Sequence, residues 1–279
     1  MGNLQQKIIT DSKKQIKQKR KKNDQQFAKK YDKTKKFVFP AKDKINMEKH
    51  FYFPKFQLNP DADMTWSFGK NPPQAALAVY PVICSRANFV KDTPFQMPQA
   101  TIAKLAGLSL PTTKKGIDHL VSKTSLLNTR KVVEGSRHYY VYHIQLIRQY
   151  LMKNWKGAYF IFHTCIINSG VWAKLFPRAK VLYLAMRSVA NFDNELYGFI
   201  EGEHLDGMDL DEFYHEEDFK NRKWDVCEKS VSALCREMNI EPSNRRLILK
   251  QLEYYRLVEK AGPVYKVYLK PRMRQFNPL

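Results

Sequence analysis

The sequence predicts an α+β protein in which two helices joined by a tight turn, followed by a β-hairpin, occur twice. Hydrophobic residues recur at spacings of three and four in the paired segments, which is typical of amphipathic helices. Each pair precedes two runs rich in β-branched and aromatic residues that flank a glycine, which is typical of a hairpin. At 279 residues, 43% of them hydrophobic, the chain is long enough to give each copy its own core.

The net charge of +21 is unevenly distributed along the chain. Residues 193–218 hold 11 carboxylates and no Lys or Arg, so the remainder carries +32. Such an excess predicts a polyanionic partner. An acidic membrane surface is the alternative, but the sequence contains no basic amphipathic helix with a large aromatic face. We therefore expect nucleic acid, and no membrane, as the partner.

A basic, disordered tail is predicted for residues 1–45. Its first 36 residues contain 13 Lys or Arg and three Asp, with few apolar side chains. Such a tail contacts phosphates without reading base sequence, and a tail that only improves solubility is the alternative. Residues 37–74 are rich in Phe, Tyr and Pro, and we expect them to form extended segments packed on the first domain.

The first domain is predicted at residues 46–150, and its first core helix begins after Asn71-Pro72-Pro73. We expect Pro81 to kink this helix or end it early, because proline lacks a backbone N–H and clashes with the preceding turn. The second helix is predicted from Gln99 to Ala106.

A tight turn is predicted within IAKLAGLSLPTTKKGIDHL, residues 102–120. Gly107 suits the left-handed conformation that ends a helix. Ser109 is expected to cap the next helix, and Pro111 fits its first turn because no N–H is needed there.

The third helix, predicted from Thr112 to Lys123, is amphipathic. Ile117, Leu120 and Val121 share its inner face at spacings of three and four. The residues expected to point outward are Thr112, Lys114, Lys115, Asp118, His119 and Ser122.

Residues 125–144 predict two strands that turn at Glu134-Gly135-Ser136. A helix-turn-helix followed by a basic-tipped hairpin is the order of a winged helix. The alternative is a helical hairpin followed by an unrelated β-hairpin. The basic residues that flank the turn are Arg130, Lys131, Arg137 and His138.

The same order returns in a second domain, residues 151–279, and so predicts two winged helix-turn-helix domains in tandem. Ile248, Leu249, Leu252 and Tyr255 are expected on the inner face of its third helix. The expected elements are helices at 176–192, 230–240 and 244–257, a turn at 241–243, and a hairpin at 258–270 that turns at 261–263.

The acidic insert, residues 193–218, falls between the first and second helices of the second domain. His204 and His215 lie among its carboxylates and could ligate a divalent metal, but the spacing matches no EF-hand or zinc motif. A solvated loop is therefore the simpler interpretation. A further hypothesis is that the insert competes with DNA phosphates for a basic face.

The sequence predicts a binding protein, not an enzyme, with no cofactor and no metal. It contains no His-hydrophobe-His triplet beside the tyrosines near His138, and no GxxxxGK[ST] phosphate loop. Its four cysteines include no CxxC pair, which indicates reduced thiols in a cytoplasm. We expect a cytoplasmic protein associated with the nucleoid or a plasmid.

The stretch IAKLAGLSLPTTKKGIDHLVSKTSLL resembles the winged helix-turn-helix of bacterial regulators and replication proteins. Tandem winged helices after a basic tail resemble the plasmid replication initiators. That resemblance implies binding to repeated origin sites of a plasmid or phage, with one domain on each half-site. It also implies a homodimer that represses its own promoter, and host replication proteins as partners. A transcriptional or partition regulator, and a metal-dependent DNA-processing enzyme, are the alternatives.

The predicted interface with double-stranded DNA combines both third helices and both hairpins. Asn244 and Arg246 are the best candidates for specificity, because Asn pairs well with adenine and Arg with guanine. Arg137 and Lys266 are expected to lie along the DNA backbone or the minor groove, where they position the hairpins without reading sequence, and Lys131 is expected to contribute to binding of any sequence. The full predicted set is Ser109, Thr112, Lys114, Lys115, His119, Lys131, Arg137, Ser243, Asn244, Arg245, Arg246, Lys250 and Lys266.

Overall fold

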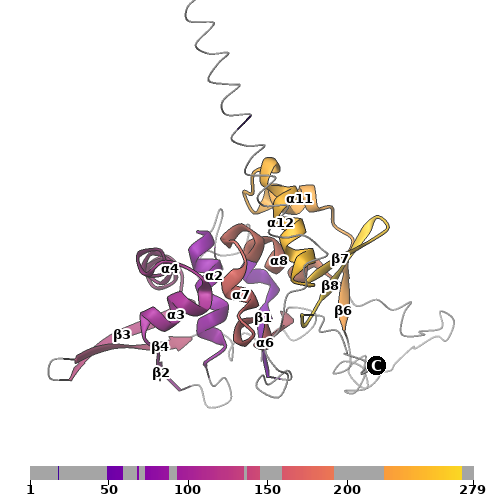
Figure 1. Ribbon diagram of the computed structural model, residues 1–279. Coiled ribbons are helices and arrows are strands. Elements are labelled where there is room, and N and C mark those ends of the chain that lie inside the picture. The colour runs from indigo at the N-terminus through magenta and orange to yellow at the C-terminus, as the bar shows by residue number, and fades with distance from the viewer. Residues whose placement is uncertain are drawn as a thin grey trace, which may run out of the picture.

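The computed structural model has mixed α and β structure (Figure 1). Three predictions lie outside the residues that it describes: the basic tail (Gln18 apart), the hairpin turn at Gly135-Ser136, and the acidic insert with His204 and His215. The described residues are 18, 49–58, 68, 73–87, 93–134, 137–144, 159–191 and 223–271.

A first unit contains three helices and a three-stranded antiparallel sheet. The sheet has the order β2-β4-β3, so the third strand of the unit lies in the middle. Its elements are α2 (Gln74–Cys84), β2 (Phe95–Gln96), α3 (Gln99–Ala106), α4 (Leu110–Ser122), β3 (Leu127–Glu134) and β4 (Arg137–Ile144).

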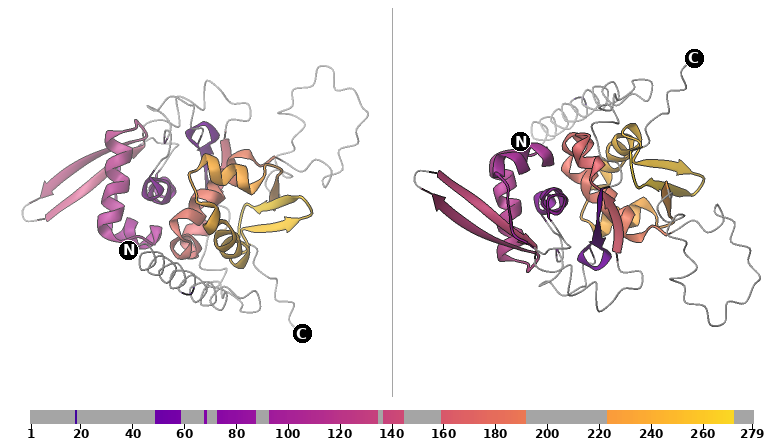
Figure 2. Two further views of the ribbon diagram at one scale, coloured as in Figure 1. Left: turned by 90° about the horizontal axis from the view of Figure 1, so that it is seen from above. Right: turned by 90° about the horizontal axis from the view of Figure 1, so that it is seen from below.

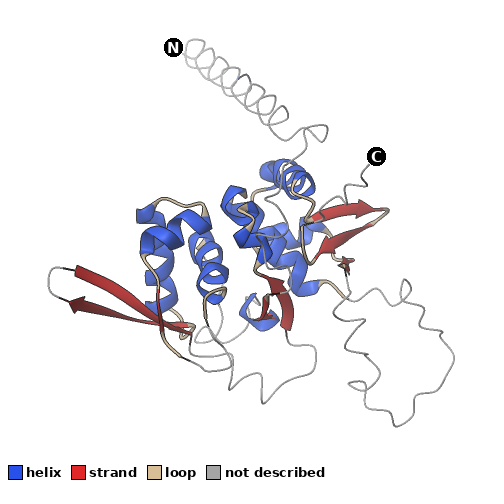
Figure 3. Ribbon diagram, turned by 60° about the horizontal axis from the view of Figure 1, so that its bottom comes forward, coloured by secondary structure: helices blue, strands red, loops and turns tan. Residues whose placement is uncertain are grey.

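A second unit repeats this arrangement. Its sheet has the order β6-β8-β7, again with the third strand in the middle. Its elements are α8 (Pro177–Val189), β6 (Trp224–Cys227), α11 (Val231–Glu237), α12 (Pro242–Tyr254), β7 (Val258–Ala261) and β8 (Val264–Tyr268). Figure 3 shows the helices of both units gathered in the middle, with the β-hairpins outside them.

The turns before α4 and α12 are built alike. Gly107 has a left-handed φ of 65°, and the N–H of Leu108 donates to the carbonyl of Ala103 at 3.0 Å. Asn239 has a φ of 49°, and the N–H of Ile240 donates to the carbonyl of Cys235 at 2.7 Å. Both turns therefore end the preceding helix with one left-handed residue and a hydrogen bond that spans it.

Two details differ from the sequence-based expectation. Helix α2 continues through Pro81 to Cys84, and Pro81 itself is buried. The N–H of Ser85 donates to the carbonyl of Pro81, so the proline does not stop the helical pattern after it. Pro242 and Ser243 belong to the first turn of α12, where proline is tolerated, and do not form the turn that precedes it.

A pair of aromatic strands adds a third sheet that the sequence only hinted at. Strand β1 (His50–Pro54) pairs antiparallel with β5 (Tyr159–His163), about a hundred residues later in the chain. The rings of Phe53 and Phe160 stack at 5.0 Å, and Phe53 meets Tyr80 of α2 edge-on at 5.7 Å. Within residues 37–74, where we expected extended segments packed on the first unit, β1 is such a segment, since Phe53 contacts α2.

Short connecting elements lie with β1 and β5 between the two units (Figure 1). They are the 3-10 helix η2 (Lys55–Leu58), α6 (Cys165–Asn168) and α7 (Val171–Lys174). The two views of Figure 2 show the β3–β4 and β7–β8 hairpins extending from opposite ends of the described fold. A continuous hydrophobic core joins residues of both units through these connecting elements.

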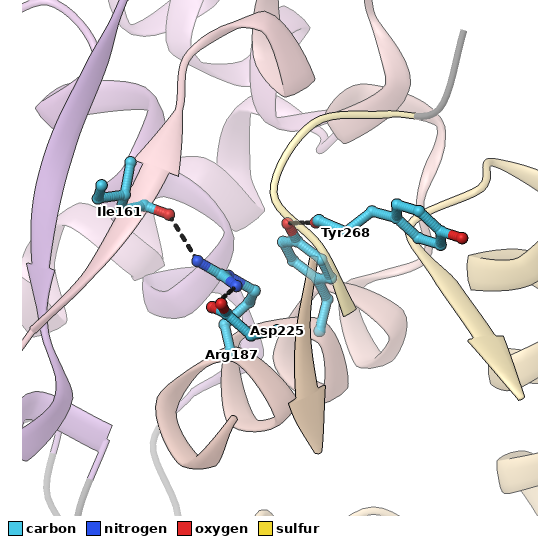
Figure 4. Close-up of polar contacts among 5 residues, drawn as sticks. Ile161, Arg187, Asp225 and Tyr268 are labelled. Carbon is cyan, nitrogen blue, oxygen red and sulfur yellow. Dashed lines mark hydrogen bonds and ion pairs between the residues drawn. The ribbon is translucent and has the colours of Figure 1, made fainter. Parts of the chain in front are cut away.

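A buried ion pair connects the middle of the molecule to the second unit. Arg187 of α8 bonds the carboxylate of Asp225 on β6, and it also donates to the carbonyl of Ile161 on β5 at 3.0 Å (Figure 4). Tyr183, one turn earlier on α8, donates to the carbonyl of Tyr268 at 2.9 Å. Helix α8 is therefore fixed to β5, β6 and β8 by polar contacts.

Within the described residues, every helix is too short or too polar to cross a lipid bilayer.

Candidate nucleic-acid interface

Helix α4 exposes one cationic face. Lys114 and Lys115 are exposed, whereas Thr113, Gly116 and Ile117 are buried against the rest of the first unit. Gly116 allows this close packing: a Cβ there would lie 2.8 Å from backbone atoms of Ala75 on α2. The outward face predicted for Lys114 and Lys115 is the one that the structure exposes.

Ser109 and Thr112 form the N-terminal cap of α4. The Ser109 hydroxyl accepts from the N–H of Thr112 at 3.4 Å, and the two hydroxyl oxygens lie 2.8 Å apart. Both side chains are exposed, and their observed partners are each other. Their position at the helix N-terminus also places free N–H dipoles there, which favours a phosphate oxygen.

His119 does not point outward, and this corrects the sequence-based expectation. Its side chain is half-buried, and it forms a hydrogen bond with the backbone of Phe68. Burial lowers the pKa of His119 below its ordinary value of 6.5, and the contact with Phe68 offsets this only in part. Burial therefore favours the neutral form of the imidazole, and the ring lies toward Phe68, which is itself buried.

The β3–β4 hairpin carries exposed cations on β3. Arg130 and Lys131 are exposed, and Lys131 pairs across the hairpin with Tyr140. Val133, on the same strand, is 64% exposed. The backbone of Arg137 pairs with Glu134, while its side chain lies outside the described part of the chain.

Helix α12 presents fewer free groups than α4. Arg246 and Ser243 are exposed. Asn244, predicted to face bases, donates to the carboxylate of Glu241 at 3.0 Å, and Arg245 donates to the hydroxyl of Ser232 on α11. Among the predicted residues of α12, Arg246 is thus the exposed cation best placed to reach a partner.

The remaining predicted cations of the second unit are partly covered. Lys250 is half-buried on α12. The Nζ of Lys266 lies 4.5 Å from the ring centroid of Trp224, so this ammonium stacks on the first strand of its own sheet. Lys266 lies mid-strand on β8, not at the tip of the hairpin, where Gly262 has a left-handed φ of 60°.

Gln251 is a residue that sequence reasoning missed. It lies on the inner face of α12 and is completely buried, which is rare for a glutamine. Its side-chain carbonyl accepts from the N–H of Phe176 at 2.8 Å, and its amide donates to the carbonyl of Lys174 at 3.2 Å. No local pattern signals this role, because both partners are backbone groups about 75 residues away.

The described side chains are suited to binding a polyanion. They offer exposed amines and guanidinium groups on helices and on a β-ribbon. Across the ranges that the structure describes, no group of three or more His, Cys, Asp or Glu residues is arranged to hold a metal ion.

Comparison with known proteins found no matching family model, no matching curated protein and no matching solved structure.

Proposed function

We propose that the protein binds double-stranded DNA sequence-specifically through two winged helices, one in each unit, as a replication initiator that recognises repeated origin sites. In this proposal α4 and α12 enter major grooves, and the two hairpins contact the flanking backbone. The observation that carries it is the outer face of α4, where Lys114 and Lys115 are exposed beside a capped helix N-terminus.

The repeated arrangement of the two units supports the proposal. Each unit has a helix, a short strand, two helices joined by a tight turn, and two strands, with the last strand in the middle of the sheet. In this proposal each unit is a winged helix, in which the third helix is the one available to a DNA groove. A helix of 13 residues, the length of both α4 and α12, spans about 20 Å.

Charge supports DNA over a neutral partner. The chain carries +21, and the exposed cations of α4, β3 and α12 add local positive potential to that overall field. The assignment as an initiator, instead of a regulator, rests on the resemblance in layout to plasmid replication initiators.

The proposal is tested by selecting sequences from a random duplex library with the full chain, and then measuring affinity for the enriched sequence by fluorescence anisotropy. We expect one sequence family to be enriched, and log K to fall with log salt with a slope of about −0.9 for each phosphate contacted. Replacement of both Lys114 and Lys115 by Ala should weaken binding and make this slope shallower.

The control is the double replacement of Lys223 and Lys229, two exposed lysines that flank β6. This replacement removes the same two charges, and it also removes the ion pair of Lys229 with Glu237, 2.7 Å away. We expect it to change affinity much less than the α4 pair does. Equal losses of affinity in the two double variants would mean that binding depends on overall charge. If the library selection enriches no sequence, sequence-specific recognition is overturned. Directly repeated sites near the gene favour an initiator, whereas a single palindrome over its promoter favours a regulator.

A further inference from the structure

The segment Trp172–Phe176 lies between the first unit and α12, and we call it the junction segment. It includes the end of α7 and the residue that caps α8. Successive residues of this segment contact different parts of the molecule. In Figure 1, α7 lies between α3 of the first unit and α8 of the second.

On the first-unit side, the junction segment makes two tight contacts. The indole N–H of Trp172 donates to the carbonyl of Ala78 in the middle of α2 at 2.9 Å. Ala173 lies against Gly107, in the turn before α4. A Cβ on Gly107 would lie 1.8 Å from the carbonyl oxygen of Ala173, so only glycine allows this approach. The turn that precedes α4 is thereby held against α7.

On the second-unit side, the next residues contact α12. The buried Gln251 binds the carbonyl of Lys174 and the N–H of Phe176 with one side chain. Both are helix-end groups, one in the last turn of α7 and the other at the N-terminal cap of α8. Gln251 therefore holds α12 to the junction segment just beyond the residue that touches Gly107.

This chain of contacts is short, and its two hydrogen-bonding side chains, Trp172 and Gln251, are buried, whereas Gly107 and Lys174 are exposed. It runs from Gly107 to Ala173, through one peptide bond to Lys174, and then to Gln251. Gln251 has no exposed surface, and Trp172 has none either. The link to α4 runs through α2, which holds the indole of Trp172 and packs closely against Gly116 of α4. A shift of α12 relative to α4 would therefore break the hydrogen bonds of Gln251 or Trp172, or open the packing of α4 on α2.

We propose that Gln251, acting through the junction segment, fixes the separation and rotation of α4 relative to α12, so that the protein recognises one composite duplex site with two half-sites at a single spacing. Gln251 is thus a positioning residue that determines site spacing and contacts no DNA itself. This inference rests on the proposed function, since it requires both third helices to bind DNA.

The coupling is first measured without DNA. Spin labels are placed on Ser122→Cys at the end of α4 and Ser243→Cys at the start of α12, both exposed positions. The four native cysteines are buried, and the chain without added cysteines controls for their labelling. We expect a narrow distance distribution by pulsed electron resonance, and a broader one in Gln251→Met, which keeps the side-chain length but makes neither hydrogen bond.

The spacing is then measured on the sequence enriched from the random library. An insertion of 5 bp between its half-sites rotates one half by about half a turn. We expect the unmodified protein to lose about 10²- to 10⁴-fold in affinity, the advantage of binding both halves at once. Gln251→Met should bind the original spacing more weakly and lose less on insertion, because its helices adapt. If this variant does not fold, the loss of affinity of the unmodified protein on insertion still tests whether the two third helices are held at a fixed spacing.

The outcomes separate this inference from the proposed function. A broad distance distribution in the unmodified protein, or a two-part site that tolerates the insertion, overturns rigid coupling but leaves DNA binding intact. An enriched sequence with only one half has the same consequence. A distribution unchanged in Gln251→Met removes the role of Gln251. The absence of any enriched sequence overturns the proposed function, and this inference with it.

Discussion

At the scale of single residues, the most unusual group is Lys180, a fully buried lysine in the first turns of α8. Its Nζ donates to the carbonyl of Leu175 at 2.5 Å and lies 5.8 Å from the ring centroid of Trp172. Burial lowers the pKa of Lys180 from 10.5 to about 7, because the charged form loses its hydration. Near neutral pH this amine is therefore close to losing its charge.

The stability of the protein should rise with pH through this group. In the unfolded chain the amine keeps its proton up to about pH 10.5, whereas in the folded protein it releases it near pH 7. Between these values the unfolded state binds more protons, so the free energy of unfolding increases by about 1.4 kcal/mol per pH unit. The burial penalty is largest below pH 7.

The measurement is urea unfolding of the unmodified protein and Lys180→Met between pH 6 and 9, because titrations common to both cancel in the difference. We expect Lys180→Met to be the more stable at pH 6, and its advantage to shrink as pH rises. A difference in free energy that is independent of pH would show that Lys180 titrates normally.

Arg246 is the single residue whose replacement should change specificity. Arg246→Ala should relax preference at one base position and cost about 1–3 kcal/mol, while Lys131→Ala on β3 should weaken binding to all sequences alike. Both side chains are exposed, so neither change should disturb the fold. Selection from the random library with each variant compares the two effects. An unaltered sequence preference in Arg246→Ala would exclude α12 as the reader.

At the scale of elements, the two left-handed glycines Gly107 and Gly262 form a natural comparison. Both have a φ near 60°, but a Cβ on Gly262 would meet no atom within 4 Å, whereas one on Gly107 would overlap Ala173. Gly262→Ala should therefore lower the free energy of unfolding by about 1–2 kcal/mol, the cost of backbone strain alone.

Gly107→Ala should cost more than Gly262→Ala, because the turn before α4 must also move away from α7. Urea unfolding of both variants gives the comparison, and the spin-label distance between α4 and α12 should shift only in Gly107→Ala. Equal costs in the two variants would mean that the contact between α3–α4 and α7 yields easily.

The elements that could be predicted from sequence are those determined by local signals. The break at Gly107, the cap at Ser109 and the amphipathic α4 follow from residues within a few positions of one another. Strands β2 and β6, which complete the two sheets, are too short to carry a periodic signal. The inward turn of His119 depends on Phe68, some fifty residues away, and no helical periodicity could indicate it.

At the scale of the whole molecule, segments far apart in the chain are joined by polar contacts that could not be predicted from the sequence. Arg187 and Asp225 are both buried, and Arg187 also lies 5.4 Å from the ring centroid of Phe160. This pair joins β5, in the middle of the molecule, to the sheet of the second unit. Charge pattern alone could not predict it, because every cation of the chain looks equally free in the sequence.

Removing one partner of this pair should be far worse than removing both. Asp225→Asn leaves a buried guanidinium without its counter-charge and should cost about 3–5 kcal/mol of unfolding free energy. The double variant Arg187→Met, Asp225→Leu should cost less than Asp225→Asn, since no buried charge remains. Urea unfolding compares them.

The exposed pair Arg178 and Glu241, 3.7 Å apart, provides the control. Glu241→Gln should change the unfolding free energy by less than about 1 kcal/mol. A similar cost for Asp225→Asn would mean that water reaches Arg187 when its partner is lost.

The pairing of β1 with β5 has a consequence for synthesis on the ribosome. A nascent chain that has just produced Phe51 and Phe53 must wait for about a hundred further residues before their strand partner exists, roughly 5–20 s at ordinary translation rates. Throughout that interval a phenylalanine-rich strand with an unpaired edge can pair with neighbouring nascent chains. We therefore expect chaperones to bind this strand during synthesis.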